Sequence, residues 1–391
     1  MGIETIAILG AGQLGYANSV YLGYLNSRNA NIILYDRTAA VVDCINGERR
    51  HPRHFTGIEL PSNVRATHSL EDLSDADIVF IDLHSTGIRE VFTGLAPYLR
   101  DGAIIVNDAK GLEKGTHQLP LEVVHEVLYA NGKSATLAAR SGWMLAANMV
   151  NGERSYADVA CEDAGVAEMV AGLFSGSRFK IRATTDVTGV QLAGIMKNVY
   201  VICAGLFVGL SKADPSREKL YGDAKAIYMA AATEEARQAG VLLGASPQTF
   251  QLNSNSWGID YYSSCSHDTI NRLLGEQIGL GMEPDKAYEF VERARGRKPE
   301  GYHTAIELYD RISSTDPGGI ERLHILNHTY RALFTGKGVE DSLMEGATEI
   351  SGSMRIRSPH GGALVLRIGR FAAKALMRAK RRALGRVSSK S

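Results

Sequence analysis

A glycine-rich turn near the N-terminus constrains the fold of this chain more than any other feature. The apolar run Thr5–Leu9 is followed by Gly10, Ala11, Gly12, Gln13, Leu14 and Gly15, and residues 16–25 can then form a helix. A strand, a G-x-G-x-x-G turn and a helix together suit a dinucleotide, because the glycines let the backbone approach a pyrophosphate and the helix N-terminus offers free N–H groups. We therefore predict that Gly10, Gly12, Gln13, Leu14 and Gly15 bind a dinucleotide. The alternative is a glycine-rich turn that binds no ligand.

An acidic residue follows at the distance that such a site requires. The second apolar run, Asn31–Tyr35, ends at Asp36, which lies 21 residues after Gly15. A carboxylate at this place accepts hydrogen bonds from the adenosine ribose and repels a 2′-phosphate. Asp36 therefore favours NAD as the cofactor over NADP, although Arg37 beside it is a residue type that can hold the 2′-phosphate of NADP.

The rest of the first half alternates short apolar runs with helical patterns. The runs cover residues 77–83, 103–106, 136–139, 158–160 and 179–182. Such alternation is typical of a mainly parallel sheet with helices on both faces. We expect an α/β Rossmann domain over residues 1–186.

From Val187 onward the pattern contains helices only, which predicts an all-α domain over residues 187–350. A long, nearly all-apolar helix is expected at residues 190–210, amphipathic helices at residues 223–238, 285–295, 302–312 and 322–335, and loops at residues 275–281 and 316–319. The segment 190–210 is long and apolar enough to span a membrane. Because a lysine near the centre of a span is unfavourable, Lys197 favours a buried core helix instead.

Lys197 is a candidate for chemistry. Burial disfavours an ammonium group, so the pKa of a lysine in a core helix falls unless an anion pairs with it. A lysine of this kind beside a nicotinamide is suited to donate a proton. The alternative is a side chain that extends to solvent at the edge of the helix, and the residues alone do not separate the two.

Charge and cysteine content exclude several other classes. The chain has 43 basic and 43 acidic residues, and its four cysteines form no C-x-x-C pair, which argues against a disulfide scaffold or a zinc ribbon. His51 and His54 lie in a basic loop without a carboxylate, so we expect no metal. With no leader peptide visible and no sign of nucleic-acid binding, a cytoplasmic location is expected.

The C-terminal residues 351–391 form a basic tail. No acidic residue follows Glu349, whereas 11 lysines or arginines do, so residues 1–350 hold 32 basic and 43 acidic residues. One helical stripe would carry Arg367, Arg370, Lys374, Arg378 and Arg381. Such a helix can make weak contact with an anionic membrane. Packing against the acidic body of the same or a neighbouring subunit is the favoured alternative.

Motifs in both halves occur in the order and spacing of one enzyme family. Residues 189–199 read G-V-Q-L-A-G-I-M-K-N-V, residues 107–113 read N-D-A-K-G-L-E and residues 300–305 read E-G-Y-H-T-A. With residues 46–67 and 326–337, they resemble NAD(P)-dependent glycerol-3-phosphate dehydrogenase over about residues 3–345. The resemblance implies a 6-phosphogluconate-dehydrogenase-like fold. The implied activity is reversible hydride transfer between nicotinamide and a small ketone, with dihydroxyacetone phosphate and sn-glycerol 3-phosphate as the substrate pair. We also expect a homodimer.

The resemblance also assigns roles to single residues. It implies that Lys197 donates a proton to the ketone oxygen, that Lys110 stabilises the alkoxide and that Asp260 pairs with the catalytic lysine. It places Asn198, Ser264, Asn271 and Arg272 at the substrate.

The substrate end departs from the family pattern. Ile270 stands where the family has the arginine that grips the substrate phosphate, and Trp143 and Met144 replace smaller residues. Either activity on a phosphate ester is weak, or another cation binds the substrate phosphate. Arg272 is the nearest candidate, but on a helix its side chain points roughly 200° away from that of residue 270. The alternative substrate is a different small ketone or 2-keto acid in a specialised pathway. A catalytically silent NAD-binding or membrane-docked protein is the rival of another class, and the retained lysines argue against it.

Overall fold

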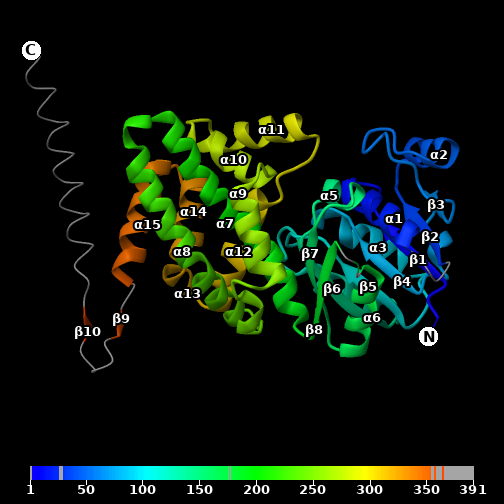
Figure 1. Cartoon of the computed structure of the whole chain (residues 1–391). Coiled ribbons are helices and arrows are strands. Elements are labelled where there is room, and N and C mark those ends of the chain that lie inside the picture. The colour runs from blue at the N-terminus through cyan, green and yellow to red at the C-terminus, as the bar shows by residue number, and fades with distance from the viewer. Residues whose placement is uncertain are drawn as a thin grey trace, which may run out of the picture.

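The computed structural model describes residues 2–25, 30–174, 176, 178–353, 356–357 and 363–364. It consists of an N-terminal α/β domain and a C-terminal helical domain that lie side by side (Figure 1). The predicted basic stripe of the tail, from Arg367 to Arg381, lies outside the described residues.

A single eight-stranded sheet forms the centre of the N-terminal domain. Its strands are β1 Thr5–Leu9, β2 Asn31–Tyr35, β3 Val64–Thr67, β4 Ile78–Ile81, β5 Ala103–Asn107, β6 Ala135–Trp143, β7 Ser155–Cys161 and β8 Phe179–Thr184. They lie in the order β3-β2-β1-β4-β5-β6-β7-β8, and only the β6–β7 pair is antiparallel. The predicted parallel-dominated sheet is therefore confirmed. The sequence analysis did not predict β3, a four-residue edge strand.

Helices cover both faces of this sheet. They are α1 Gln13–Leu25, α2 Ala39–Glu48, α3 Ile88–Leu95, α4 Pro120–Ala130, α5 Ala146–Val150 and α6 Ala164–Phe174. Successive strand residues point to opposite faces, so Ile6 and Ile8 of β1 pack into the core shared with α1 and α2, whereas Ala7 and Leu9 pack into the core shared with α3 and α4. This two-sided burial explains why the strands are apolar along their whole length.

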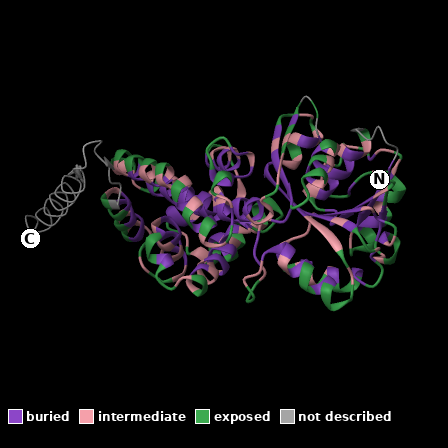
Figure 2. Ribbon diagram, turned by 90° about the horizontal axis from the view of Figure 1, so that it is seen from below, coloured by how far each residue is buried: buried purple, intermediate pink, exposed green. Residues whose placement is uncertain are grey.

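The C-terminal domain is built around one long helix. Its helices are α7 Val187–Ala213, α8 Glu218–Leu242, α9 Asp260–Ser266, α10 Ile270–Gly279, α11 Pro284–Arg295, α12 Gly301–Thr315, α13 Gly319–Arg322, α14 His324–Phe334 and α15 Val339–Ser353. Two short strands follow, β9 Ile356–Arg357 and β10 Ala363–Leu364. Within the described part of the chain, α7 alone is long and apolar enough to cross a membrane. Most of it is buried inside the protein, as predicted for a core helix. Figure 2 shows that buried residues run through the middle of both domains.

The prediction of a loop at residues 275–281 is wrong. Gly275 lies within α10, which packs along α7. A Cβ atom at Gly275 would lie 2.1 Å from the carbonyl oxygen of Ile202 in α7, and one at Gly205 would lie 2.2 Å from that of Arg272 in α10. These glycines allow the two helix backbones to approach closely, a role that a sequence pattern does not distinguish from a turn.

Candidate active site

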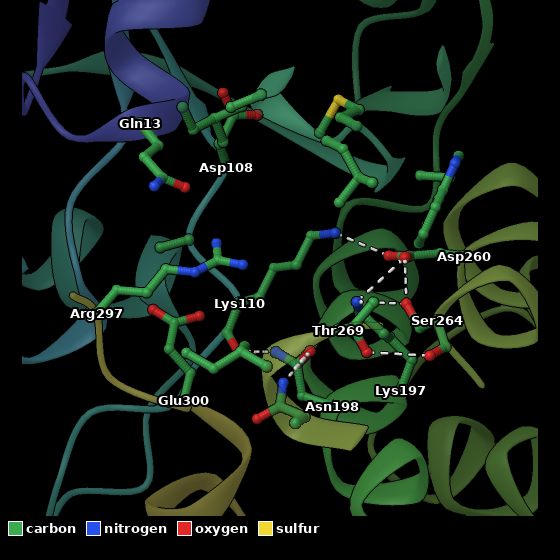
Figure 3. Close-up of a pocket in the computed structure, with 18 of the residues that line it drawn as sticks. Gln13, Asp108, Lys110, Lys197, Asn198, Asp260, Ser264, Thr269, Arg297 and Glu300 are labelled. Carbon is green, nitrogen blue, oxygen red and sulfur yellow. Dashed lines mark hydrogen bonds and ion pairs between the residues drawn. The ribbon is translucent and has the colours of Figure 1, made fainter. Parts of the chain in front are cut away.

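A pocket of about 350 Å³ lies where the two domains meet (Figure 3). The N-terminal domain contributes loops that follow β1, β4, β5 and β6, and the helical domain contributes α7, α9, the start of α10 and the segment before α12. The carboxyl edge of a parallel sheet is the usual position of a ligand site in such folds. The pocket is therefore the candidate active site.

Asp260 is held in this pocket by the sheet itself. It begins α9, directly after one turn of π-helix, Asn255–Ile259. The buried carboxylate of Asp158 in β7 accepts hydrogen bonds from the backbone N–H and the hydroxyl of Ser256, at 2.8 and 2.7 Å. A strand of the N-terminal domain thus holds the turn that positions Asp260 in the pocket.

The carboxylate of Asp260 contacts two lysines. Its Oδ2 accepts a hydrogen bond of 2.7 Å from Nζ of Lys110, and its Oδ1 lies 3.1 Å from Nζ of Lys197. Lys197 also donates to Oγ of Ser264 at 3.1 Å, and this hydroxyl donates to Asp260 at 3.2 Å. The Lys197 side chain is only 12% exposed, so it does not extend to solvent. The structure brings together the three predicted catalytic residues and Ser264 (Figure 3).

This arrangement perturbs the proton affinity of Lys197. Burial lowers its pKa, the negative charge of Asp260 acts in the opposite direction, and the positive charge of Lys110 lowers it further. A lysine with a lowered pKa releases its proton more readily and is suited to general acid catalysis.

Two asparagines join the pocket to the backbone around it. Nδ2 of Asn271 donates to Oδ1 of Asn198 at 2.9 Å, and Nδ2 of Asn198 donates to the carbonyl of Lys110 at 3.3 Å. The backbone N–H of Gly301 donates to Oδ1 of Asn271 at 3.1 Å. Asn198 and Asn271 both line the pocket and link α7, α10 and α12.

The predicted cofactor residues form a cradle beside the pocket. Gly10, Gly12 and Gly15 lie in or beside the turn between β1 and the start of α1, and Gln13 and Leu14 line the pocket. A Cβ atom at Gly15 would lie 1.9 Å from the carbonyl oxygen of Gly10, so the turn requires glycine there. The tight turn, the N–H groups of α1 and a carboxylate at the end of β2 fit a dinucleotide.

That carboxylate belongs to Asp36. Its oxygens accept hydrogen bonds from the backbone N–H groups of Thr38, at 2.9 Å, and Ala11, at 3.3 Å. The side chain is thereby held next to the glycine turn. Its carboxylate has lone pairs left for hydroxyl groups of a ribose.

A buried charge cluster that the sequence analysis missed lies at the β4 and β5 ends of the pocket. The fully buried guanidinium of Arg140 donates to both oxygens of Asp108, at 2.8 and 2.5 Å, and to Asn18 at 3.0 Å. Asn18 also donates to Asp82 at 2.7 Å. Burial, and then the charge of Asp108, raise the pKa of Asp82 well above its usual range. The local sequence gave no signal of this cluster, whose members come from four separate elements.

Comparison with known proteins identifies the family. The N-terminal sequence profile of NAD-dependent glycerol-3-phosphate dehydrogenase matches residues 5–167, and the C-terminal profile matches residues 186–344. The chain belongs to the NAD-dependent glycerol-3-phosphate dehydrogenase family. The predicted family, fold class and dehydrogenase chemistry are thereby confirmed.

Individual relatives cover nearly the whole chain. Glycerol-3-phosphate dehydrogenase [NAD(P)+] of Halorhodospira halophila is 32% identical over 346 residues, which are 88% of this chain and 96% of that protein. Glycerol-3-phosphate dehydrogenase [NAD(P)+] 2 of Salinibacter ruber is 30% identical over 345 residues, 87% of this chain and 93% of that one. The crystal structure of the glycerol-3-phosphate dehydrogenase of Coxiella burnetii has the same fold, with a TM-score of 0.75, 23% identity and coverage of 88% of this chain and 99% of that one.

The pocket of this glycerol-3-phosphate dehydrogenase family member differs from the sequence prediction at one end. Arg272 does not line it, because its guanidinium donates to the carbonyl of His267 at 2.8 Å and lies 3.6 Å from Glu276. Ile270 does line the pocket, together with Arg297 and Lys298, which the sequence analysis did not select. The only available signal was two adjacent basic residues just before the E-G-Y-H-T-A motif.

Proposed function

We propose that this chain reversibly reduces dihydroxyacetone phosphate to sn-glycerol 3-phosphate in the cleft between its domains. The observation that carries the proposal is the pair of lysines, Lys197 and Lys110, held by one buried carboxylate beside a dinucleotide cradle. A bound dinucleotide supplies or accepts the hydride.

Residues of the chain donate the proton to the ketone oxygen and stabilise the negative charge that develops there. Reduction of a ketone places negative charge on its oxygen, and Lys197 donates a proton there. Lys110 stabilises the same developing charge. Asp260 and Ser264 hold the ammonium group of Lys197 in position and keep it protonated before the reaction. In the oxidative direction the neutral Lys197 takes the proton back.

The coenzyme of this chain is NAD(H) rather than NADP(H). Asp36 supports this choice, because a carboxylate at the end of β2 repels a 2′-phosphate. The ratio of kcat/KM for NADH and NADPH tests it, and Asp36→Ala should lower that ratio. A wild-type ratio that favours NADPH contradicts the proposal.

A second substrate class has support at the other end of the pocket. Ile270 offers no charge to a phosphate, and the bulky Trp143 also lines the pocket, with its ring centre 5.1 Å from that of His267. These residues favour a different small ketone or a 2-keto acid. The reaction chemistry at Lys197 would be the same.

A substrate panel decides between the two. NADH consumption is measured with dihydroxyacetone phosphate, dihydroxyacetone and a series of 2-keto acids, and the product is checked for sn-glycerol 3-phosphate. We expect kcat/KM above about 10⁴ M⁻¹s⁻¹ for dihydroxyacetone phosphate, the lower end of the usual range for enzymes. A 2-keto acid that is reduced more efficiently would establish the second class.

The remaining features complete the proposal. The cofactor domain spans residues 1–186, the helical substrate domain residues 187–350 and the basic tail residues 351–391. A homodimer, a cytoplasmic location and a weak contact between the tail and anionic membranes stay predictions.

A further inference from the structure

One arginine that lines the pocket forms no ion pair with any residue that the structure describes. Four lysine or arginine side chains line the pocket: Lys110, Lys197, Arg297 and Lys298. The first two pair with Asp260. Within the described part of the chain, neither Arg297 nor Lys298 makes a hydrogen bond or an ion pair. Figure 3 shows the guanidinium of Arg297 directed into the pocket.

Contacts at the following residues hold the segment of Arg297 across the cleft. It lies in the short loop between α11 and α12, after Gly296, whose φ of 64° ends α11. The carboxylate of Glu300 lies 3.8 Å from Nε2 of His84 in the N-terminal domain. Gly301 donates its backbone N–H to Asn271 at 3.1 Å. The loop is thus attached on both sides of the pocket, and Arg297 lies between these contacts and α11.

Neighbouring arginines are already engaged. Arg272 contacts the carbonyl of His267 and the carboxylate of Glu276. Arg295 pairs with Asp268 at the rim of the pocket. Among the described arginines of this region, Arg297 is therefore the one whose guanidinium is left to bind an external anion, although the negative charge of Glu300 acts on it.

We propose that Arg297 binds the anionic group of the substrate, in place of the arginine that Ile270 replaces. The inference rests on the proposed function, since it assumes a phosphate ester as substrate. A guanidinium binds phosphate through two parallel charge-assisted hydrogen bonds, which is stronger and more directional than neutral donors. The two catalytic lysines share one carboxylate, so the phosphate needs a further cation, and Arg297 supplies it from α11–α12 rather than from α10.

The dinucleotide is the other anion near this pocket. Its pyrophosphate has its own donors at the N-terminus of α1, next to Gln13. At the substrate end Asn271 is engaged with Asn198 and Gly301, and Ile270 is apolar. Arg297 and Lys298 are the cations that line the pocket without an ion pair among the described residues, and of the two only the guanidinium binds an anion through two parallel hydrogen bonds. The arrangement therefore favours the substrate as the partner of Arg297.

Kinetics of Arg297→Met in the full chain test the inference. Arg293→Met is the matched control. It removes the same charge from an exposed residue of α11 that lies outside the pocket. We expect KM for dihydroxyacetone phosphate to rise at least about tenfold in Arg297→Met, the usual effect of losing a hydrogen bond to a charged group. The values for unphosphorylated dihydroxyacetone and the Kd for NADH should stay unchanged, and Arg297→Lys should recover part of the loss.

A second variant guards against indirect effects. Adding Ile270→Arg to Arg297→Met should restore a low KM for dihydroxyacetone phosphate, because it returns a cation to α10. An unchanged KM in Arg297→Met overturns the inference while leaving the proposed function intact. A raised Kd for NADH with equal losses on both ketones also overturns it and assigns Arg297 to the dinucleotide. A wild-type protein that does not reduce dihydroxyacetone phosphate overturns the proposed function itself.

Discussion

Replacing Asp260 by asparagine removes the one negative charge that both active-site lysines share. Nζ of Lys197 lies 3.1 Å from this carboxylate, so at an effective dielectric constant of about 20 the lost attraction is roughly 5 kcal/mol, and in bulk water it is about 1 kcal/mol. The loss of this attraction lowers the pKa of Lys197. Burial and the charge of Lys110 act in the same direction.

The sign of the effect on activity follows from the role of Lys197. Ketone reduction needs the protonated lysine, so activity is lost as the pH rises through its pKa. In Asp260→Asn the basic limb of the kcat/KM profile should therefore move to lower pH. Initial rates of NADH oxidation between pH 6 and 10 measure it, with Asp223→Asn on the exposed face of α8 as the control. A basic limb that does not move would refute the assignment of Lys197 as the acid.

Two further predictions concern stability. Gly275→Ala should destabilise the protein by about 1–3 kcal/mol, because its Cβ would lie 2.1 Å from a carbonyl of α7, whereas Gly222→Ala in open space on α8 should be stabilising by about 0.5–1 kcal/mol. Urea unfolding of both variants measures the difference, and equal midpoints would contradict the close packing of α7 and α10. Arg140→Met should lower the free energy of unfolding by about 3–5 kcal/mol, since it removes the ion-pair partner of the buried Asp108 carboxylate. A loss below about 1 kcal/mol would show that Asp108 finds another partner.

Local patterns were sufficient to predict the fold. Three elements could be predicted because residues close together in the sequence specify each of them. They are the turn from Gly10 to Gly15, the strand before Asp36 and the helix around Lys197. Parallel pairing of apolar strands then leaves few arrangements. The sequence analysis missed β3 because four residues at a sheet edge bury too little apolar surface to produce a pattern.

The site was only partly predictable, because its residues meet through tertiary contacts. The contact of Asp260 with Lys110 joins residues 150 positions apart, and only the resemblance to a known family suggested that Asp260 pairs with a lysine. Arg297 was missed because its place in the pocket depends on how the α11–α12 loop crosses to the N-terminal domain. Arg140 was missed for the same reason, since its partners Asp108 and Asn18 come from two other parts of the fold.

The central claim is that a proton donor on α7 and a dinucleotide on the Rossmann domain act on one ketone in the shared cleft. Single-turnover stopped-flow kinetics test it most directly, with enzyme-bound NADH mixed with dihydroxyacetone phosphate. The wild type should oxidise NADH, and Lys197→Met should bind NADH with unchanged Kd while hydride transfer slows by about 10²–10⁴-fold. A Lys197→Met protein that keeps more than about a tenth of the wild-type rate would contradict the account.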